Sequence, residues 1–286
     1  MNKNLRVSVV IPVYNEEEQL AACLQALAVQ TVTPYQVIVV DNNSSDNSVA
    51  VAHQFPFVKV ISEPRQGVVH ARKTGFNAAK GDIIGRIDAD TLLPTDWVES
   101  VQHIFGDETI DAVSGAALYY NVAWASAFNT IDLFFRRRLS WQLRDRVYLY
   151  GANMAIRKRA WTGVRERLCN SGGMHEDYDI AIHLQELGGK VRFDECLRAR
   201  VSSRRIDVNL VDFMRYVLVA PGTYAQHGIR ARWHMYPLVA VCAAGYLPAR
   251  LLHRGYDEQT DSFSFMKIFA PSQLPTRVDP TTHVAN

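Results

Sequence analysis

Two aspartates, Asp88 and Asp90, stand one residue apart in "RIDADT", directly after an apolar run that is typical of a strand. Alternate residues of an extended chain point to the same side, so the two carboxylates can converge. Like charges that converge repel each other, and burial strengthens the repulsion. The pair therefore faces water or has a positive group beside it. Mg²⁺ or Mn²⁺ would satisfy both carboxylates, because these cations prefer oxygen ligands. A plain alternative is that Asp90 caps a turn before "TLLPTDW".

A second acidic pair, Glu176 and Asp177, occurs in "HEDYDIAIHL" at the start of a predicted amphipathic helix. A carboxylate whose pKa lies near the working pH can take a proton from a hydroxyl group held at hydrogen-bonding distance. Acidic residues also favour the first turn of any helix because of its dipole. Both interpretations stay open from these residues alone.

The first hundred residues alternate between short β-branched runs and helical stretches. Strands are predicted in "VSVVIPV", "YQVIVVD", "VKVIS" and "DIIGRID", and helices in "NEEEQLAACLQALAVQ", "SSDNSVAVAHQF" and "GVVHARKTGFNAAKG". Such alternation predicts an α/β protein with a Rossmann-like, mainly parallel sheet covered by helices. Ligands of these sheets bind beyond the carboxyl ends of the strands. We therefore expect the chemistry at residues 12–16, 41–45, 62–67 and 88–91.

The pattern is less regular after residue 105. We predict a strand in "AVSGAAL", an aromatic-rich helix from Val122 to Leu143, and a helix in "EDYDIAIHLQELG". Two final strands are expected in "KVRFDECLRARVSS", and residues 256–286, rich in proline and polar residues, are expected to form a mobile tail.

Composition excludes several classes of protein. The chain has 286 residues, of which 48% are hydrophobic and 21% charged, which argues against disorder. A net charge of +2 gives no general attraction to nucleic acid, so no nucleic-acid partner is expected. The four scattered cysteines form no CxxC pair, which argues against a structural zinc site and a disulfide framework and favours the cytoplasm. No signal-peptide pattern is recognised at the N-terminus.

No membrane-spanning helix is predicted, because no uninterrupted apolar run reaches about 18 residues. The nearest approach, Met235 to Leu252, contains two prolines and an arginine, and we interpret it as a buried or interfacial helix. In the aromatic-rich helix, three consecutive arginines, Arg136 to Arg138, follow most of the aromatic residues. Aromatics beside a basic cluster suit an interfacial helix on an anionic membrane, although one apolar helix face is more often core. Peripheral membrane contact at the inner face of the membrane is therefore one expectation.

Two common nucleotide-binding loops are absent from the sequence. The first strand-to-helix turn, "PVYNEEE", has no glycine, whereas a GxGxxG loop needs glycine for close approach to a pyrophosphate. GxxxxGK[ST] is also missing.

Six motifs, "VSVVIPVYNEE", "VIVVDNNSSD", "GVVHARKTGFNAAKGDII", "RIDADT", "GANMAIRKRAW" and "HEDYDIAIHL", occur in this order. The set resembles the family 2 inverting glycosyltransferases, which have the GT-A fold and use nucleotide-activated sugars. It covers roughly residues 6–205 and implies a GT-A catalytic domain over 1–205, with a nucleotide-sugar-binding half (1–105) and an acceptor-binding half (106–205). A helical C-terminal extension would occupy residues 206–255.

The resemblance also implies roles for individual residues. Asp90 would be the direct metal ligand, Asp88 would contact the ribose or the metal, and Asp41 would accept a hydrogen bond from uracil. The residues implied in donor binding are Pro12, Tyr14, Glu16, Asp41, Arg72, Asp88, Ala89 and Asp90. For Asp41 the alternative is a helix cap before "DNSVAVA".

In the second half, the resemblance implies that Asp177 is the catalytic base and that Glu176 orients the acceptor or donor sugar, with Glu176 as base the fallback. Gly151 and Asn153 would lie near the donor sugar and acceptor, and Arg204 and Arg205 near the diphosphate. Processive relatives carry QxxRW where this chain has "VSSRRIDV", which argues against processive polymer synthesis.

The sequence therefore predicts an inverting glycosyltransferase that depends on Mn²⁺ or Mg²⁺. It would move one sugar from a nucleotide-sugar donor, a UDP-sugar in the first instance, to a hydroxyl acceptor that is lipid-linked or a cell-envelope glycan. GDP- and dTDP-sugars remain alternatives for the donor. A nucleotidyltransferase and a catalytically inactive nucleotide-sugar-binding scaffold are the alternative functions.

Overall fold

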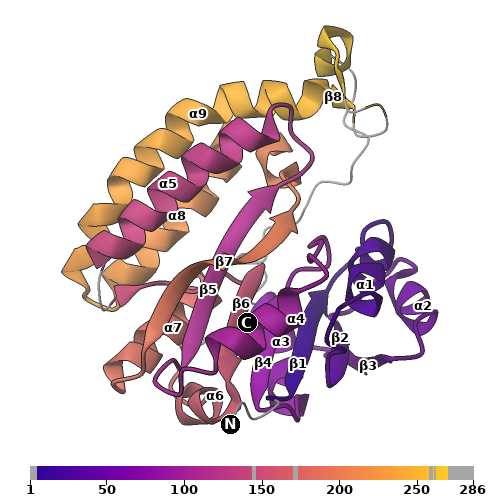
Figure 1. Ribbon diagram of the computed structural model, residues 1–286. Coiled ribbons are helices and arrows are strands. Elements are labelled where there is room, and N and C mark those ends of the chain that lie inside the picture. The colour runs from indigo at the N-terminus through magenta and orange to yellow at the C-terminus, as the bar shows by residue number, and fades with distance from the viewer. Residues whose placement is uncertain (1–4, 144–145, 170–172, 258–259, 261, 270–286) are drawn as a thin grey trace.

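A seven-stranded sheet forms the centre of the protein, in the strand order β3-β2-β1-β4-β6-β5-β7 (Figure 1). The computed structural model describes residues 5–143, 146–169, 173–257, 260 and 262–269. The strands of this sheet are β1 (Val7–Val13), β2 (Gln36–Asp41), β3 (Val58–Ser62), β4 (Ile83–Ile87), β5 (Ala112–Tyr119), β6 (Asn153–Arg157) and β7 (Val191–Val201). All pairings are parallel except those of β6, which is antiparallel to both β4 and β5. The predicted α/β class with a mainly parallel sheet is confirmed.

Helices cover both faces of the sheet. They are α1 (Leu20–Ala28), α2 (Ser48–His53), α3 (Val68–Ala78), α4 (Trp97–Ile104), α5 (Ala125–Leu143), α6 (Lys158–Val164), α7 (Glu176–Glu186), α8 (Leu210–Gln226) and α9 (Tyr236–Gly255). Short 3₁₀ helices, η2 (Arg204–Asp207), η3 (Arg230–Met235) and η4 (Phe265–Phe269), and the small strands β8 (Tyr256–Asp257) and β9 (Ser262–Phe263) complete the described elements.

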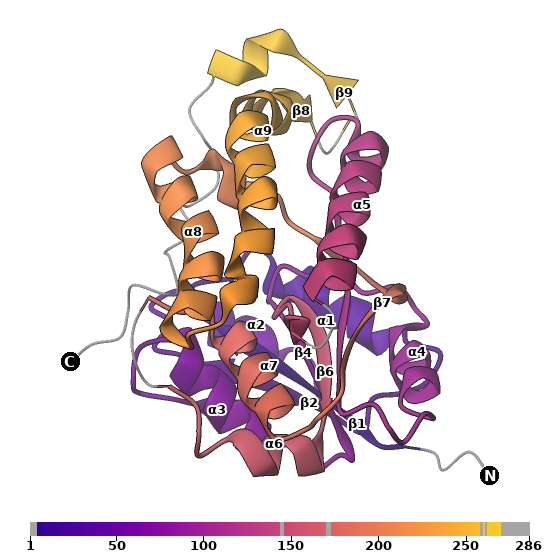
Figure 2. The ribbon, with the colours of Figure 1, turned by 90° about the vertical axis from the view of Figure 1, so that its left-hand side faces the viewer.

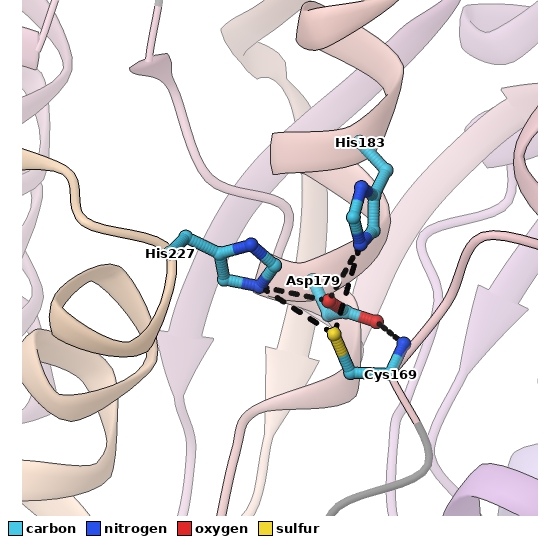
Figure 3. A group of neighbouring side chains, drawn as sticks. All are labelled: Cys169, Asp179, His183 and His227. Carbon is cyan, nitrogen blue, oxygen red and sulfur yellow. Dashed lines mark hydrogen bonds and ion pairs between the residues drawn. The ribbon is translucent and has the colours of Figure 1, made fainter.

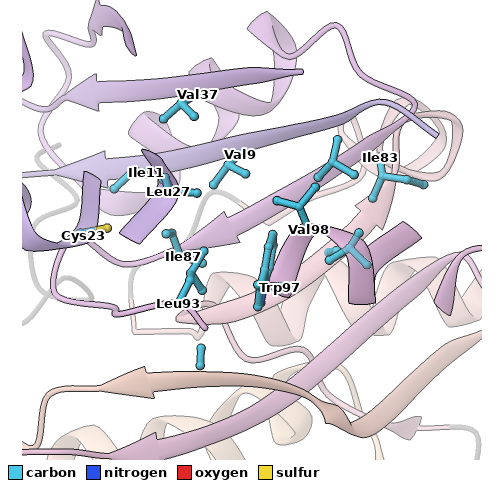
Figure 4. Close-up of a cluster of buried hydrophobic side chains, with 14 of the residues drawn as sticks. Val9, Ile11, Cys23, Leu27, Val37, Ile83, Ile87, Leu93, Trp97 and Val98 are labelled. Carbon is cyan, nitrogen blue, oxygen red and sulfur yellow. The ribbon is translucent and has the colours of Figure 1, made fainter. Parts of the chain in front are cut away.

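Alternating side chains of the central strands enter two separate cores, since successive residues of a strand point to opposite faces. Val9 and Ile11 of β1 pack with α1 and α4 in one core, which contains the fully buried Trp97 (Figure 4). Val10 packs on the other face against Phe76 of α3 and residues of α6 and α7. Burial on both faces explains why the strands read as continuous apolar runs.

Helix α1 begins later than the sequence pattern predicts. Asn15 has a positive φ of 52°, and the backbone carbonyl of Glu16 accepts hydrogen bonds from the amides of Gln19 and Leu20. The helix starts at Leu20, so the acidic residues of "NEEEQL", which the predicted helix included, precede it. This early turn leaves the Glu16 side chain outside the helix.

The two strands expected in "KVRFDECLRARVSS" are one strand, β7, of 11 residues. Its register with β5 shifts between Gly115 and Ala116, where Asp194 and Arg198 become successive partners. A bulge of this kind lets an extended pairing bend without ending. The polar residues in the middle of the segment therefore mark the irregularity and not a turn.

Three long helices, α5, α8 and α9, stand together above one end of the sheet (Figure 2). The helix predicted from Val122 begins at Ala125, because Trp124 has a positive φ of 55°. Prolines do not break α9: Pro237 lies in its first turn, where the backbone N–H is not needed, and Pro248 lies inside the helix. By length and composition, Arg230–Gly255 could cross a membrane, and 17% of its apolar window is buried. The expectation of no membrane-spanning helix rested on the absence of a long uninterrupted apolar run, and the average hydropathy of this helix is high enough despite its prolines and arginine.

Part of the predicted tail has regular secondary structure. Residues of β8 and β9 pair antiparallel, and the Phe263 ring packs 5.1 Å from that of Phe265 in an edge-on arrangement. The prediction for residues 270–286 lies outside the described part of the chain.

The segment after β3 is held by a buried carboxylate, Glu63. It accepts hydrogen bonds from Nε (2.8 Å) and Nη2 (2.9 Å) of Arg65, from the Arg65 amide (3.0 Å), and from Oγ1 of Thr74 (2.5 Å). The Arg65 guanidinium, together with Thr74, holds the pKa of Glu63 at about 2, below its ordinary 4.5.

A depressed pKa in the folded state stabilises the protein above the unfolded pKa, and this contribution is lost as the pH falls toward the folded value. We therefore expect Glu63→Gln to lower the free energy of unfolding at pH 7 by about 1 to 3 kcal/mol. The difference from wild type should shrink between pH 5 and pH 3, which urea unfolding at both values measures. A difference that is constant over this range would contradict the assignment.

Candidate functional site

A cavity of about 640 Å³ opens beyond the carboxyl ends of β1 and β4 and continues between α5, α8 and α9. Most of the predicted site residues line it, from segments far apart in the chain. They are Pro12, Tyr14, Glu16, Asp88, Ala89, Asp90, Gly151, Glu176, Asp177, Arg204 and Arg205. The location agrees with the rule that ligands of parallel sheets bind at this edge.

The charges of Asp88 and Asp90 are each met by an arginine. Nη2 of Arg86 lies 3.3 Å from Oδ1 of Asp88, and Nε of Arg204 lies 2.9 Å from Oδ2 of Asp90. Asp90 is almost fully buried, and the side chain of Asp88 is 20% exposed. Two cations thus offset the repulsion within the acidic pair in this structure.

The second arginine also binds the carboxylate of Glu16. Nη2 of Arg204 lies 2.5 Å from Oε1 and 2.6 Å from Oε2 of Glu16. The late start of α1 places Glu16 here, and the buried Ser48 side chain accepts a hydrogen bond from its amide at 2.8 Å. Residues 16, 90 and 204 therefore form one buried charged group in which a single guanidinium serves two carboxylates.

Arg86 joins the two acidic pairs, and the sequence reasoning missed it. Its Nη1 lies 3.0 Å from Oε1 of Glu176, while its Nη2 faces Asp88. A Cβ at Gly151 would lie 1.6 Å from Nη1 of Arg86, so only glycine leaves room for this guanidinium. The signal was present in "RIDAD", because Arg86 precedes Asp88 by two residues and so points to the same side of the strand.

Asp177 is buried and held by two backbone amides. The amide of Gly151 donates to its Oδ2 at 2.6 Å, and the amide of Tyr178 donates to its Oδ1 at 2.9 Å. Burial, and then the charge of Glu176, raise the pKa of Asp177 well above its usual range. For Glu176, burial acts in the same direction, but the guanidiniums of Arg86 and Arg72 outweigh it and lower the pKa. Neighbouring carboxyls whose pKa values are driven apart are typical of acid–base sites.

Three predicted residues are not among those that line the cavity. Asp41 accepts a hydrogen bond from the Ser44 amide at 3.1 Å, so it shapes the turn after β2. Asn153 is fully buried: its Nδ2 donates to the carbonyls of Ala116 (2.9 Å) and Leu197 (2.8 Å), and its Oδ1 accepts from Nε1 of Trp97. Alternate residues of β6 point to opposite faces of the sheet, and the Asn153 side chain points to the face that Trp97 of α4 covers, away from the cavity.

Arg72 is 1% exposed, behind the wall that Val68 and Ala71 of α3 contribute. Its Nε and Nη1 have no hydrogen-bond partner among the described residues. Burial lowers the pKa of Arg72 to about 10, against the favourable charges of Glu176 and Asp177. Arg72 therefore influences the cavity through its charge.

The turn beside the cavity is built on Asn42, which the cavity contacts directly. Its Nδ2 donates to the carbonyls of Glu63 (2.9 Å) and Arg65 (2.7 Å), and its Oδ1 accepts from the Gly67 amide (2.7 Å). Gly67 has φ 129°, a conformation that favours glycine.

An aromatic wall was also missed by the sequence reasoning. Tyr119, Tyr148, Tyr150 and Tyr216 line the cavity between the acidic group and the long helices. The Arg205 guanidinium lies over the Tyr216 ring at 3.8 Å, and that of Arg136 lies over Tyr150 at 4.7 Å. Their spacing in sequence follows no period, so no local pattern could have found this wall.

Beyond this wall most of the cavity lining is apolar, although the ion-paired Asp132 and Arg136 of α5 also line the cavity. The apolar residues are Phe128, Ile131, Phe135 and Leu139 of α5, Phe213, Val217 and Ala220 of α8, and Leu238, Val239, Val241, Cys242, Gly245, Ala249 and Leu252 of α9. We call this part the apolar chamber. One cavity thus has a charged end at the sheet and an apolar end between the helices.

The acidic pair fits a divalent cation. Both carboxylates follow β4 at the edge of the cavity, and carboxylate oxygens are the ligands that Mg²⁺ and Mn²⁺ take from proteins. Arg204 and Arg205 on the same wall add positive charge for an anionic ligand such as a diphosphate.

The sequence is similar to known glycosyltransferases. The model of the family "Glycosyl transferase family 2" matches residues 8–162. "Glycosyltransferase AglE" of Haloferax volcanii is 30% identical over 159 residues, 53% of this chain and 52% of that protein. "Undecaprenyl-phosphate 4-deoxy-4-formamido-L-arabinose transferase" of Serratia proteamaculans is 32% identical over 165 residues, 54% and 49% of the two chains. The chain thus matches about half the length of these curated relatives.

Solved structures agree on the fold. A mannosyltransferase from Pyrobaculum calidifontis, in complex with GDP-Man and Mn²⁺, superposes with a TM-score of 0.64 at 20% identity, covering 86% of this chain and 73% of that one. Glucosyl-3-phosphoglycerate synthase from Mycobacterium tuberculosis, with Mn²⁺ and UDP, gives 0.53 at 19% identity, covering 79% and 81%. The fold is therefore GT-A. By the family match over more than half its length, this chain belongs to glycosyl transferase family 2.

Proposed function

We propose that this glycosyltransferase moves one sugar, with inversion, from a UDP-sugar to a hydroxyl acceptor carried on a lipid. The observation that supports it best is that the acidic pair, Asp177 and the apolar chamber line one continuous cavity. A charged end suits a nucleotide diphosphate, and an apolar end suits a lipid chain. Residues 1–205 would form the catalytic domain, and residues 206–255 would supply two walls of the chamber.

At the charged end, Asp88 and Asp90 would hold Mn²⁺ or Mg²⁺. When bound, such a cation neutralises charge on a leaving diphosphate. Arg204 and Arg205 would bind the phosphate oxygens, and Glu16 would keep Arg204 in place through its two close contacts. Pro12, Tyr14 and the turn containing Asp41 would receive the base. Mn²⁺ in two structural neighbours supports the use of a divalent metal.

Asp177 would act as the base. The acceptor oxygen attacks the anomeric carbon, its proton passes to a carboxylate oxygen of Asp177, and the bond to the diphosphate breaks with its electron pair leaving on UDP. Amides of Gly151 and Tyr178 hold the carboxylate in position, and its raised pKa suits proton transfer near neutral pH. Glu176, kept anionic by Arg86 and Arg72, would orient a sugar hydroxyl.

The direct test is a transfer assay with purified full chain, Mn²⁺, and UDP-, GDP- or dTDP-linked sugars. Two acceptors with the same reactive hydroxyl are compared, one water-soluble and one carrying a polyprenyl chain. We expect transfer from the UDP-sugar, preference for the polyprenyl acceptor, and a product of opposite anomeric configuration by NMR. Retained configuration would overturn the inverting mechanism, release of pyrophosphate would indicate a nucleotidyltransferase, and nucleotide binding without any turnover would indicate a scaffold.

A bulky side chain in the apolar chamber should weaken binding of the lipid acceptor without affecting binding of the donor. Val239 of α9 lines the chamber, whereas its neighbour Ala240 is exposed and does not. We expect Val239→Trp to raise KM for the polyprenyl acceptor about 10-fold or more, which corresponds to a loss of about 1.4 kcal/mol of binding free energy. KM for the UDP-sugar should stay unchanged. Ala240→Trp is the matched control, and equal effects of the two variants would remove the chamber from acceptor binding.

We also propose that the outer faces of α5 and α9 contact the membrane. Exposed side chains Phe134 and Trp141 share one face of α5 with Arg138, whose guanidinium lies 4.8 Å over the Trp141 ring. On α9, Leu247 is 61% exposed. Apolar and aromatic side chains with arginines suit an anionic bilayer surface.

Vesicle co-sedimentation checks this contact. The double variant Phe134→Ser and Leu247→Ser should lower the bound fraction on vesicles that contain anionic lipid. The matched control is Val29→Ser with Phe57→Ser, which replaces exposed residues after α1 and before β3. In Figure 1, α1 and β3 lie at the opposite side of the ribbon from α5 and α9. Equal binding of both double variants would contradict the proposal.

A further inference from the structure

Four side chains with metal-binding atoms meet at one point outside the cavity. They are Cys169, which follows α6, Asp179 and His183 of α7, and His227, which directly follows α8 (Figure 3). One ligand atom from each lies within 4.8 Å of every other. None of the four lines the cavity that holds the acidic pairs.

The separations agree with a tetrahedral zinc site. Nε2 of His227 lies 3.0 Å and Nε2 of His183 lies 3.4 Å from Oδ1 of Asp179. Sγ of Cys169 lies 3.8 Å from Nε2 of His183 and 4.0 Å from that of His227. Ordinary zinc bond lengths and tetrahedral angles give about 3.4 Å between nitrogen and oxygen ligands and about 3.6 Å between sulfur and nitrogen. Small shifts would bring all four atoms into contact with one ion.

The surroundings already orient these ligands. The Cys169 amide donates to Oδ2 of Asp179 at 2.9 Å, which turns Oδ1 toward the two imidazoles. Oε2 of Glu186 lies 2.9 Å from Nδ1 of His183, so a proton on Nδ1 leaves Nε2 available to a metal. A carboxylate on the far nitrogen of a histidine is the usual support of a zinc ligand. Asp179 is buried, and the side chain of His227 is 9% exposed.

We propose that Cys169, Asp179, His183 and His227 bind one Zn²⁺ as a closed, four-ligand structural site. Mixed sulfur and nitrogen ligands select zinc over Mg²⁺ or Mn²⁺, which prefer oxygen alone. Four protein ligands leave no open position for a substrate, which distinguishes a structural site from a catalytic one. When the ion binds, the Cys169 thiol releases its proton to solvent, since the thiolate is the ligand.

The site would join α7 to α8, the first helix of the C-terminal extension. Helix α7 carries Asp177 and Glu176 in its first turn, and His227 comes from the end of α8, which forms one wall of the apolar chamber. A hydrogen bond from the His175 amide to Oγ1 of Thr223, at 3.0 Å, and the packing of the Tyr178 and Tyr224 rings also cross this junction. A zinc ion would hold α8 against α7 at a further point.

Metal analysis of the full chain, purified after zinc supplementation and gel filtration, tests the site. We expect one zinc per chain in wild type and its loss in Cys169→Ser and in His227→Ala. The matched controls Cys196→Ser and His103→Ala replace exposed residues elsewhere and should keep the zinc. Absence of zinc from wild type, or its retention in both ligand variants, would overturn the proposal.

Cobalt substitution of wild type gives a readout that does not depend on folding of a variant. Co²⁺ at this site should show intense tetrahedral ligand-field absorption with a thiolate-to-cobalt charge-transfer band, removed by an excess of Zn²⁺. Carboxylates at Asp88 and Asp90 cannot produce a thiolate band. A spectrum without that band would show that the four side chains form only a hydrogen-bonded cluster. Neither readout uses sugar transfer, so the result stands apart from the proposed function.

Discussion

Asp177→Asn is expected to lower kcat for sugar transfer by about 10²- to 10⁴-fold, the range for loss of a general base. The amide keeps the size of the side chain, and its oxygen can still accept from the Gly151 amide that now donates at 2.6 Å. The hydrogen bond from the Tyr178 amide is lost, but a buried charge that burial disfavours is removed as well, and the two effects offset each other. A neutral amide cannot take the acceptor proton. We therefore expect the dissociation constant for UDP and the Tm to stay close to wild type, with the change confined to kcat in steady-state assays.

Glu176→Gln is the informative comparison, because Glu176 is the alternative base. Its carboxylate lies 3.0 Å from Nη1 of Arg86, and Arg72 is buried nearby. Removing that charge breaks one of the two ion pairs of buried Arg86, which keeps its contact with Asp88, and removes a charge that favours buried Arg72. Breaking a buried pair costs about 3 to 5 kcal/mol of stability in comparable cases. A lowered Tm should therefore mark Glu176→Gln and not Asp177→Asn. Near-normal kcat in Asp177→Asn, with turnover abolished in a folded Glu176→Gln, would transfer the role of base to Glu176.

Asp90→Asn is expected to abolish Mn²⁺-dependent binding of the donor nucleotide. A ligand at about 100 times its dissociation constant adds about 2.7 kcal/mol to the stability of the folded state. In a thermal-shift panel of UDP, GDP, dTDP and CDP, with and without Mn²⁺, wild type should show this stabilisation for one nucleotide, expected to be UDP. Asp90→Asn should lose it, since the buried carboxylate that now pairs with Arg204 is then gone.

The control is Asp96→Asn, which alters an exposed carboxylate before α4 and should keep the nucleotide response. No manganese-dependent shift for any nucleotide in wild type would contradict the metal-bound donor site. A shift that persists in Asp90→Asn would place the metal elsewhere.

Much of the first half could be predicted from local patterns. The β-branched runs of β1 to β4 and the helical spacing between them are patterns of neighbouring residues. The same patterns were enough to predict that Asp88, Asp90 and Tyr14 lie at one edge of the sheet. Parallel strands bring their carboxyl ends to the same side whatever else the chain does.

Local patterns could not predict what long-range pairing produced. The Asn153 side chain of antiparallel β6 points away from the cavity and donates a hydrogen bond to the carbonyl of Ala116. The two expected strands are a single strand, β7, whose pairing with β5 continues past a bulge. Prolines that read as interruptions are part of α9, because packing and a first-turn position override propensity.

By itself, the sequence determined the α/β class and the edge of the sheet where the acidic residues gather, since strand and helix periods and residue chemistry are properties of short segments. Only the tertiary structure decided which cations meet those acids: Arg204 reaches Asp90 across 114 residues. It also decided that α5, α8 and α9 enclose an apolar chamber, and that Cys169, Asp179, His183 and His227 meet. Contacts of this kind depend on where whole elements pack, which burial of apolar faces over the entire chain determines.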